Sequence, residues 1–154
     1  YAAGRNRYIG HLISMATRSF KDKRVGLDCS NGSASAIAKS VFDALGAKTY
    51  VINNEPDGTN INTNCGSTHM QELMARVVSE KANCGIAFDG DADRMLAVDE
   101  NGKVTAAGHI DVVVIFIPSC IVRVARSGAV CKLYIITGSN VFIPNDRGYY
   151  IPVG

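Results

Sequence analysis

Three aspartates, Asp89, Asp91 and Asp93, stand at alternate positions in the stretch "FDGDADR". On a tight turn, three carboxylates at this spacing can direct oxygens at one small octahedral cation and leave coordination positions for water and a phosphate. Arg94 follows directly and offers a forked donor suited to a phosphate oxygen. Acids that hold a metal next to an arginine suit phosphoryl transfer, because both neutralise developing negative charge.

The same acids fit two other interpretations. Counted from Asp89, an EF-hand calcium loop would have acids at its first, third and fifth positions and a final glutamate at Glu100, and the sequence matches these positions. The sixth position, however, is Arg94 where that loop needs glycine, and the flanking segments are typical of strands rather than helices. A solvated acidic turn without any ligand is the second alternative. The pattern therefore favours a magnesium-type site over a calcium site and leaves the solvated turn open.

The segments before this loop alternate between helical and strand patterns. Apolar residues at helical spacing predict a lead-in helix within residues 2–19, and apolar runs predict strands at 24–30, 47–54 and 82–88. Helices are predicted between these strands, within 31–47 and 70–81. This order predicts an α/β fold, a three-layer doubly wound, mostly parallel sheet with right-handed crossovers. Ligands of such sheets bind beyond the carboxyl ends of the strands, where the acidic loop lies.

Residues at the helix ends suggest how the helices begin and stop. Asn31 or Ser33 can cap the first crossover helix, and Gly46 stands where a C-terminal glycine belongs. Thr68, with Gln71 three residues later, resembles a capping box for the second.

The segments after the acidic loop are less regular. "MLAV" and "KVTA", joined by "DENG", predict an appended β-hairpin with Gly102 in its turn. The apolar stretch from Ile110 to about Ser127 predicts a buried helix broken near Pro118, and residues 129–137 predict a strand. Residues 138–154 are turn-rich and give no clear pattern.

The composition is that of an ordinary globular protein. Hydrophobic residues make up 47% and charged residues 19%, and 16 basic against 14 acidic residues give a net charge of +2. The sequence has no block of like charge, so it does not indicate nucleic acid or a membrane surface as a partner. Five widely spaced cysteines without a C-x-x-C pair predict reduced, buried thiols in a cytoplasmic protein.

Several motifs resemble one enzyme family. "DGDADR" resembles the metal-binding loop of the α-D-phosphohexomutases, and "DGTNINTNCGSTHMQEL" (57–73) resembles a loop and helix of its bacterial phosphoglucosamine mutase branch. "GRNRYIGHLI" and "VGLDCSNGSAS" resemble the opening of the family's second domain. The resemblance runs in the family's order from about residue 4 to residue 111.

The resemblance implies an isomerase that interconverts glucosamine 6-phosphate and glucosamine 1-phosphate through a phosphoserine and a bisphosphorylated sugar. By position, Asp89, Asp91 and Asp93 would be ligands of Mg²⁺, and Arg94 would position and stabilise the phosphate. His69 would lie near the cleft, where loop ordering is at least as plausible as chemistry. His11 is most simply a residue of a helix surface.

The resemblance also has limits. Ser30 and Ser33 are helix-entry serines, and nothing here resembles the family's phosphoserine loop or its sugar-selecting and phosphate-binding loops. We therefore expect residues 1–109 to be the metal-binding second domain, and residues 110–154 to be a truncated or diverged start of the third. The chain alone would then be inactive, and its partners would be the hexosamine phosphate, through the full-length enzyme, and the other domains of that enzyme. The alternative is a non-catalytic derivative that binds a cation or a partner protein.

Overall fold

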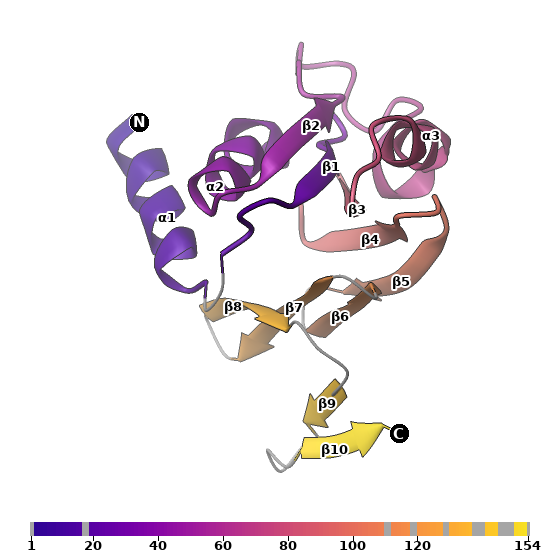
Figure 1. Ribbon diagram of the computed structural model, residues 1–154. Coiled ribbons are helices and arrows are strands. Elements are labelled where there is room, and N and C mark those ends of the chain that lie inside the picture. Colours follow the sequence, from indigo (N-terminus) through magenta and orange to yellow (C-terminus); the bar gives the residue numbers. More distant parts are fainter. Residues whose placement is uncertain are drawn as a thin grey trace.

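The computed structural model describes residues 2–16 and 19–109 and, beyond them, residues 112–117, 120–127, 130–136, 141–144 and 150–153; side chains are described as far as residue 104. Figure 1 shows the chain with its elements labelled. Among the described residues, no helix is long and apolar enough to cross a membrane.

Helices and strands alternate through the first part of the chain. The helices are α1 (Ala2–Ser14), α2 (Ala38–Ala44) and α3 (Gln71–Ser79), with short 3₁₀ turns η1 (Ser33–Ala36) and η2 (Gly66–Thr68). The strands are β1 (Arg24–Asp28), β2 (Lys48–Ile52), β3 (Cys84–Phe88), β4 (Arg94–Asp99) and β5 (Val104–His109). The predicted order of helices and strands is thus confirmed as far as His109.

These five strands form one sheet in the order β2-β1-β3-β4-β5. β1 is parallel to both neighbours, with Leu27 opposite Val51 in β2 and Ile86 in β3. β4 and β5 are antiparallel additions next to β3, and they form the predicted hairpin, with Gly102 in its turn at a φ of +77°. The predicted α/β fold with parallel strands and an appended hairpin is confirmed.

Helices cover both faces of this sheet. α1 and α2 lie on one side and α3 on the other (Figure 1). On the α2 side, Val41 and Phe42 pack with Val25, Leu27 and Ile86 of the sheet in one buried cluster. On the α3 side, Leu73 and Val77 pack with Ala87 and Val98 in a second buried cluster. The two clusters make the three layers that the sequence predicts.

Two glycines let α3 lie directly on the sheet. Gly26 of β1 and Gly85 of β3 are opposite each other in the register. A β-carbon on Gly85 would lie 2.6 Å from Val77 Cγ2, and one on Gly26 would lie 3.1 Å from Leu73 Cδ1. The helix therefore packs against backbone at this point, and this close approach fixes the height of α3 above β1 and β3.

Two of the predicted helix caps are wrong, whereas Gly46 is confirmed. Neither crossover helix has a side-chain cap, and the residues before them are Ile37 and Met70. Asn31 accepts a hydrogen bond from the Glu55 N–H with its side chain, and so holds a distant loop rather than a helix end. Gly46 follows α2 with a φ of +94°, in the left-handed conformation expected after a helix.

The predicted helix between Ile110 and Ser127 is also wrong. The structure has strands β6 (Val112–Ile117) and β7 (Cys120–Ser127) there, antiparallel to each other. β-Branched residues dominate Val112–Ile117, and their restricted χ1 angles favour strands over helices. β8 (Val130–Ile136) confirms the next prediction and completes a three-stranded sheet. β9 (Val141–Pro144) and β10 (Tyr150–Val153) form an antiparallel pair in the segment that gave no pattern.

Candidate metal centre

The acidic loop joins β3 to β4 at the carboxyl end of β3. Asp89, Asp91 and Asp93 each place a carboxylate oxygen within 4.8 Å of the other two. Asp89 is 6% exposed, whereas Asp91 and Asp93 are exposed to solvent. Three convergent oxygens, one buried and two accessible, can hold a hard divalent cation and leave its outer side open.

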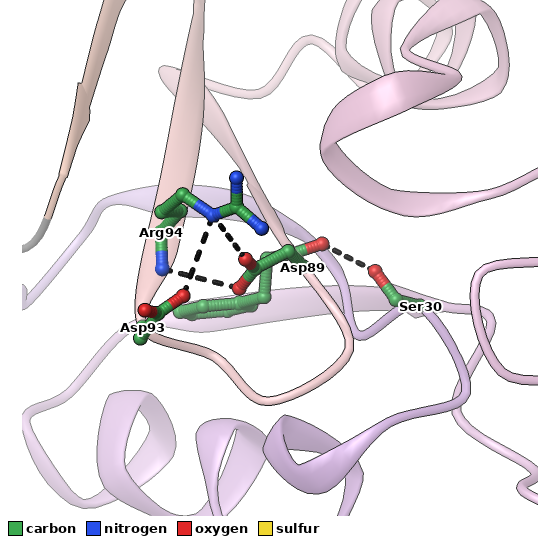
Figure 2. Close-up of polar contacts among 5 residues, drawn as sticks. Ser30, Asp89, Asp93 and Arg94 are labelled. Atoms are coloured by element: carbon green, nitrogen blue, oxygen red, sulfur yellow. Dashed lines mark hydrogen bonds and ion pairs between the residues drawn. The ribbon is translucent and has the colours of Figure 1, made fainter.

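Arg94 lies across two of these acids (Figure 2). Its Nε is 2.7 Å from Asp89 Oδ2 and 3.4 Å from Asp93 Oδ1, and its backbone N–H donates to Asp89 Oδ1 over 3.1 Å. Both side-chain contacts use Nε, and 57% of the side chain is exposed. The forked end of the guanidinium therefore remains accessible above the acids.

Asp89 and Asp93 have different electrostatic environments. Burial raises the pKa of Asp89, but hydrogen bonds from the backbone and side chain of Arg94 outweigh it, and the net shift is downward. The pKa of Asp93 is raised, first by its hydrogen bond with Asp89 and then by the charges of Asp91 and Asp89. Asp89 in turn raises the pKa of Arg94. A divalent cation would relieve the repulsion among the carboxylates.

The turn itself contains backbone strain. Ala92 has a φ of +59°, which is rare for a residue with a β-carbon, and its N–H donates to the Asp89 carbonyl. Such strain persists only where the surroundings fix the conformation, and it occurs often at functional sites.

The loop after β1 supports the acidic loop from one side. The Ser33 N–H donates to the Gly90 carbonyl over 2.9 Å, and a β-carbon on Gly32 would overlap that carbonyl. The Ser30 hydroxyl donates to the carbonyl of Phe88, the residue before Asp89 (Figure 2). Two backbone carbonyls of the acidic loop region are thus held by the β1 loop.

The asparagine-rich segment supports it from another side. A β-carbon on Gly90 would lie 2.6 Å from Asn62 Nδ2 and 2.9 Å from Ile61 Cδ1. The Asn62 N–H donates to the Ser30 carbonyl, which joins this segment to the β1 loop. Asn62 and Asn64 have left-handed backbone conformations, with φ values of +58° and +53°. Asparagine tolerates that conformation better than most residues, which explains part of the composition of this segment.

A buried carboxylate, Asp28, joins these supports. Asp28 is 0% exposed at the end of β1. Its Oδ1 accepts from the Ser30 N–H and from Asn53 Nδ2 over 2.9 and 3.2 Å, and its Oδ2 accepts from the Gly66 N–H over 2.9 Å. Burial raises the pKa of Asp28 and outweighs these three donors, which lower it. Asp28 is not among the site residues predicted from the sequence, although an acid at the end of an apolar strand, in "VGLDCSNG", is a usable signal.

The structure does not bring the other predicted residues into the acidic cluster. Glu100 lies beyond β4, at the opposite end of that strand from Asp89, and it is half-buried. With strands on both sides and Glu100 away from the cluster, the loop is not an EF-hand. His69 is exposed and its Nδ1 lies 3.1 Å from Thr68 Oγ1, and His11 is exposed on α1. Thr68 therefore contacts its neighbour and does not cap α3.

A family model described as phosphoglucomutase/phosphomannomutase, alpha/beta/alpha domain II, matches residues 6–102. The chain belongs to this family. The match covers well over half of the chain and ends within the turn between β4 and β5. It includes every residue of the acidic cluster.

Relatives and a solved structure agree with this membership. The chain is 66% identical over 104 residues to the phosphoglucosamine mutase of Lachnoclostridium phytofermentans, covering 68% of the chain and 23% of that protein. It is 66% identical over 110 residues to that of Lachnospira eligens, covering 71% and 24%. A phosphoglucomutase/phosphomannomutase family protein from Burkholderia thailandensis matches with a TM-score of 0.57 and 26% identity, over 66% of this chain and 22% of the other. The chain therefore spans about a quarter of the length of the mutases it resembles.

Proposed function

We propose that this chain is the metal-carrying second domain of a phosphoglucosamine mutase, and that the whole enzyme interconverts glucosamine 6-phosphate and glucosamine 1-phosphate through a phosphoserine and a bisphosphorylated sugar. The observation that carries the proposal is the cluster of Asp89, Asp91 and Asp93, with carboxylate oxygens within 4.8 Å of each other. Two relatives that are 66% identical over this region are phosphoglucosamine mutases, and they supply the reaction that we propose.

The donor set fits Mg²⁺. Hard carboxylate oxygens are the ligands that this ion takes in proteins, and it commonly keeps several waters or substrate oxygens beside one or two carboxylates. Asp89, Asp91 and Asp93 would hold it, and the exposure of Asp91 and Asp93 leaves room for a phosphate. When bound, the ion supplies Lewis-acid stabilisation of a transferring phosphoryl group.

Arg94 has two roles in this proposal. Its Nε and backbone N–H fix the Asp89 carboxylate, so that one ligand is held in a single orientation. Its accessible forked end would bind a phosphate oxygen and stabilise the charge that develops during transfer. We propose Arg94 as the residue of this domain that acts in catalysis, in addition to the three metal ligands.

Two boundaries support the extent of the domain that we propose. The family match ends at residue 102, and the five-stranded sheet ends at His109. We propose that residues 1–109 form the second domain. We propose that residues 110–154 belong to the next unit, which corresponds to the third domain of the family that the sequence resembles. In the second unit, the described segments β6 to β8 are strands where a helix was expected.

We propose that the domain alone does not turn over substrate, because the phosphoserine and the sugar and phosphate clamps would come from other domains of the enzyme. Its partners are then those domains and the hexosamine phosphate that they bind jointly. The cytoplasmic location remains a prediction.

A domain replacement tests the proposal directly. Residues 6–102 would replace the matching segment of the phosphoglucosamine mutase of Lachnospira eligens, to which the chain is 66% identical. We expect the chimera to convert glucosamine 6-phosphate in the presence of Mg²⁺, and the same chimera with Asp91→Ala to lose at least 99% of that activity. A folded chimera without turnover would overturn the mutase assignment and favour the non-catalytic derivative.

A further inference from the structure

A hydrogen-bond network connects the buried end of β1 to the start of the acidic loop. It begins at the buried carboxylate of Asp28 and includes Ser30, Asn53 and Gly66. We infer that Asp28 is a positioning residue for the metal centre and that it acts through Ser30. This inference rests on the proposed function, and its test separates the two.

Asp28 holds Ser30 in an unusual conformation. Ser30 has a φ of +55° and is fully buried, and the next residue, Asn31, has a φ of +49°. Two successive left-handed residues with β-carbons need external support. The bond from the Ser30 N–H to Asp28 Oδ1 supplies it on one side, and the bond from the Asn31 N–H to the Asn53 carbonyl on the other.

That conformation directs the Ser30 hydroxyl at the acidic loop. The hydroxyl donates to the carbonyl of Phe88, directly before Asp89 (Figure 2). On the other side, Gly66 fits against the same two groups: a β-carbon there would overlap Ser30 Oγ and lie 2.6 Å from the Phe88 carbonyl oxygen. Asp28 Oδ2 holds Gly66 through its N–H. The one carboxylate therefore fixes both backbone segments that contact the start of the acidic loop.

The chemistry of the network requires a carboxylate in particular. Asp28 receives N–H donors at both oxygens, from Ser30 at one and Gly66 at the other. Asparagine has the same shape but only one acceptor oxygen, so one of these two backbone donors would face an NH₂ group. Loss of such a buried partner leaves the donor unsatisfied, and the loop that carries it has to move.

The test uses the 154-residue chain and Mn²⁺ as a spectroscopic probe, with free Mn²⁺ measured by electron paramagnetic resonance and Mg²⁺ as competitor. Asp28→Asn is expected to weaken Mn²⁺ binding at least tenfold, which is the range for groups that orient metal ligands from behind. Ser30→Ala removes only the hydroxyl bond to Phe88 and is expected to weaken binding at least threefold. If the Asp28→Asn variant does not fold, the Ser30→Ala variant alone tests the inference.

Two controls separate positioning from other effects. Glu72→Gln removes an exposed negative charge that contacts the same Asn53 side chain, so it reports the effect of charge alone. Val77→Ala removes buried packing on the α3 face, so it reports the effect of lowered stability alone. Both are expected to stay within twofold of the unsubstituted chain, with folding followed by urea titration.

The possible results distinguish failure of the inference about Asp28 from failure of the proposed metal centre. Asp28→Asn and Ser30→Ala within twofold of the unsubstituted chain would overturn the inference, as would an equal loss in Glu72→Gln or Val77→Ala. An unsubstituted chain that binds neither Mn²⁺ nor Mg²⁺ at millimolar concentration would instead overturn the proposed metal centre itself.

Discussion

The neighbouring parallel strands β1 and β3 each have an aspartate at the carboxyl end. The surroundings of these two aspartates differ. β1 ends with Asp28 in "VGLDCSNG", and β3 is followed by Asp89 in "IAFDGDADR". Asp28 is fully buried and accepts hydrogen bonds from uncharged groups of Ser30, Asn53 and Gly66. Asp89 is nearly as buried, but it is paired with Arg94 and lies beside two exposed acids.

The difference shows that two turns at the carboxyl ends of neighbouring strands have different roles. The turn after β1 uses its carboxylate to organise backbone, and the pKa of that carboxyl is raised by burial. The turn after β3 offers carboxylate oxygens to one space, and the pKa of Asp89 is lowered by Arg94 despite burial. The turn after β1 is a support and the turn after β3 is a candidate site, although each begins with an acid at the carboxyl end of a parallel strand. Four experiments test whether the turns after β1 and β3 have these different roles.

The largest effect is expected where the two turns meet, at Gly66. Its φ is +74°, and a β-carbon would overlap Ser30 Oγ. Gly66→Ala should lower the free energy of unfolding by about 3 kcal/mol, from the left-handed conformation plus the overlap. Gly58→Ala is the matched control, because Gly58 has a φ of +92° and open space around it, and it should cost about 1 kcal/mol. Equal losses in urea titrations would show that the turns are not packed against each other at this point.

The sequence predicts the strands of this sheet better than the contacts between its loops. Short apolar runs bounded by Asn, Gly and Asp predict β1, β2 and β3, and alternate acids after β3 predict the cluster, because both signals lie within a few residues. The bond between Asp28 and Gly66 joins residues 38 apart, and no local pattern contains it. The caps fail for the same reason, since Asn31 bonds to Glu55, which is 24 residues away.

The failed helix between Ile110 and Ser127 has a different cause. A continuous apolar run has no periodicity that separates a buried helix from a buried strand. Its β-branched residues were the better guide, because β6 covers the run from Val112 to Ile117.

The second expected effect distinguishes a ligand turn from a solvated acidic turn. Asp91→Asn should weaken Mn²⁺ binding by about 10- to 100-fold, because a neutral amide is a poorer ligand and the charge of the cluster falls. Its free energy of unfolding without metal should change by less than about 0.5 kcal/mol, since Asp91 is exposed. Asp57→Asn, in an exposed turn outside the cluster, is the control for Mn²⁺ binding. Equal Mn²⁺ affinities in the Asp91 and Asp57 variants would mean that the acidic loop is a solvated turn and not a metal site.

The third effect concerns Arg94, the cationic side chain that pairs with Asp89 in the turn after β3. Arg94 lies against Asp89 and Asp93 and offsets part of their charge. Arg94→Gln should therefore bind Mn²⁺ more tightly, by about three- to tenfold at low salt, with a smaller gain at high salt. In the chimeric mutase the same substitution should lower kcat, because the phosphate loses its forked donor. Weaker Mn²⁺ binding in this variant would mean that orienting Asp89 matters more than the charge of Arg94.

The smallest effect is the pH dependence of the support turn, measured without metal. Asp28 has a raised pKa in the folded chain, above the value of about 3.9 for an unfolded aspartate. As the pH rises above that value, the unfolded chain loses its proton first, so the folded state binds more protons and its stability falls. The stabilising contribution of Asp28 is thus complete below about pH 3.9 and declines as the pH rises through the folded pKa. The difference in unfolding free energy between the unsubstituted chain and Asp28→Asn should therefore narrow as the pH rises from about 4 to about 7. A difference that widens with pH would mean that the three donors outweigh burial at Asp28, and that both turns keep their carboxylates charged for the same reason.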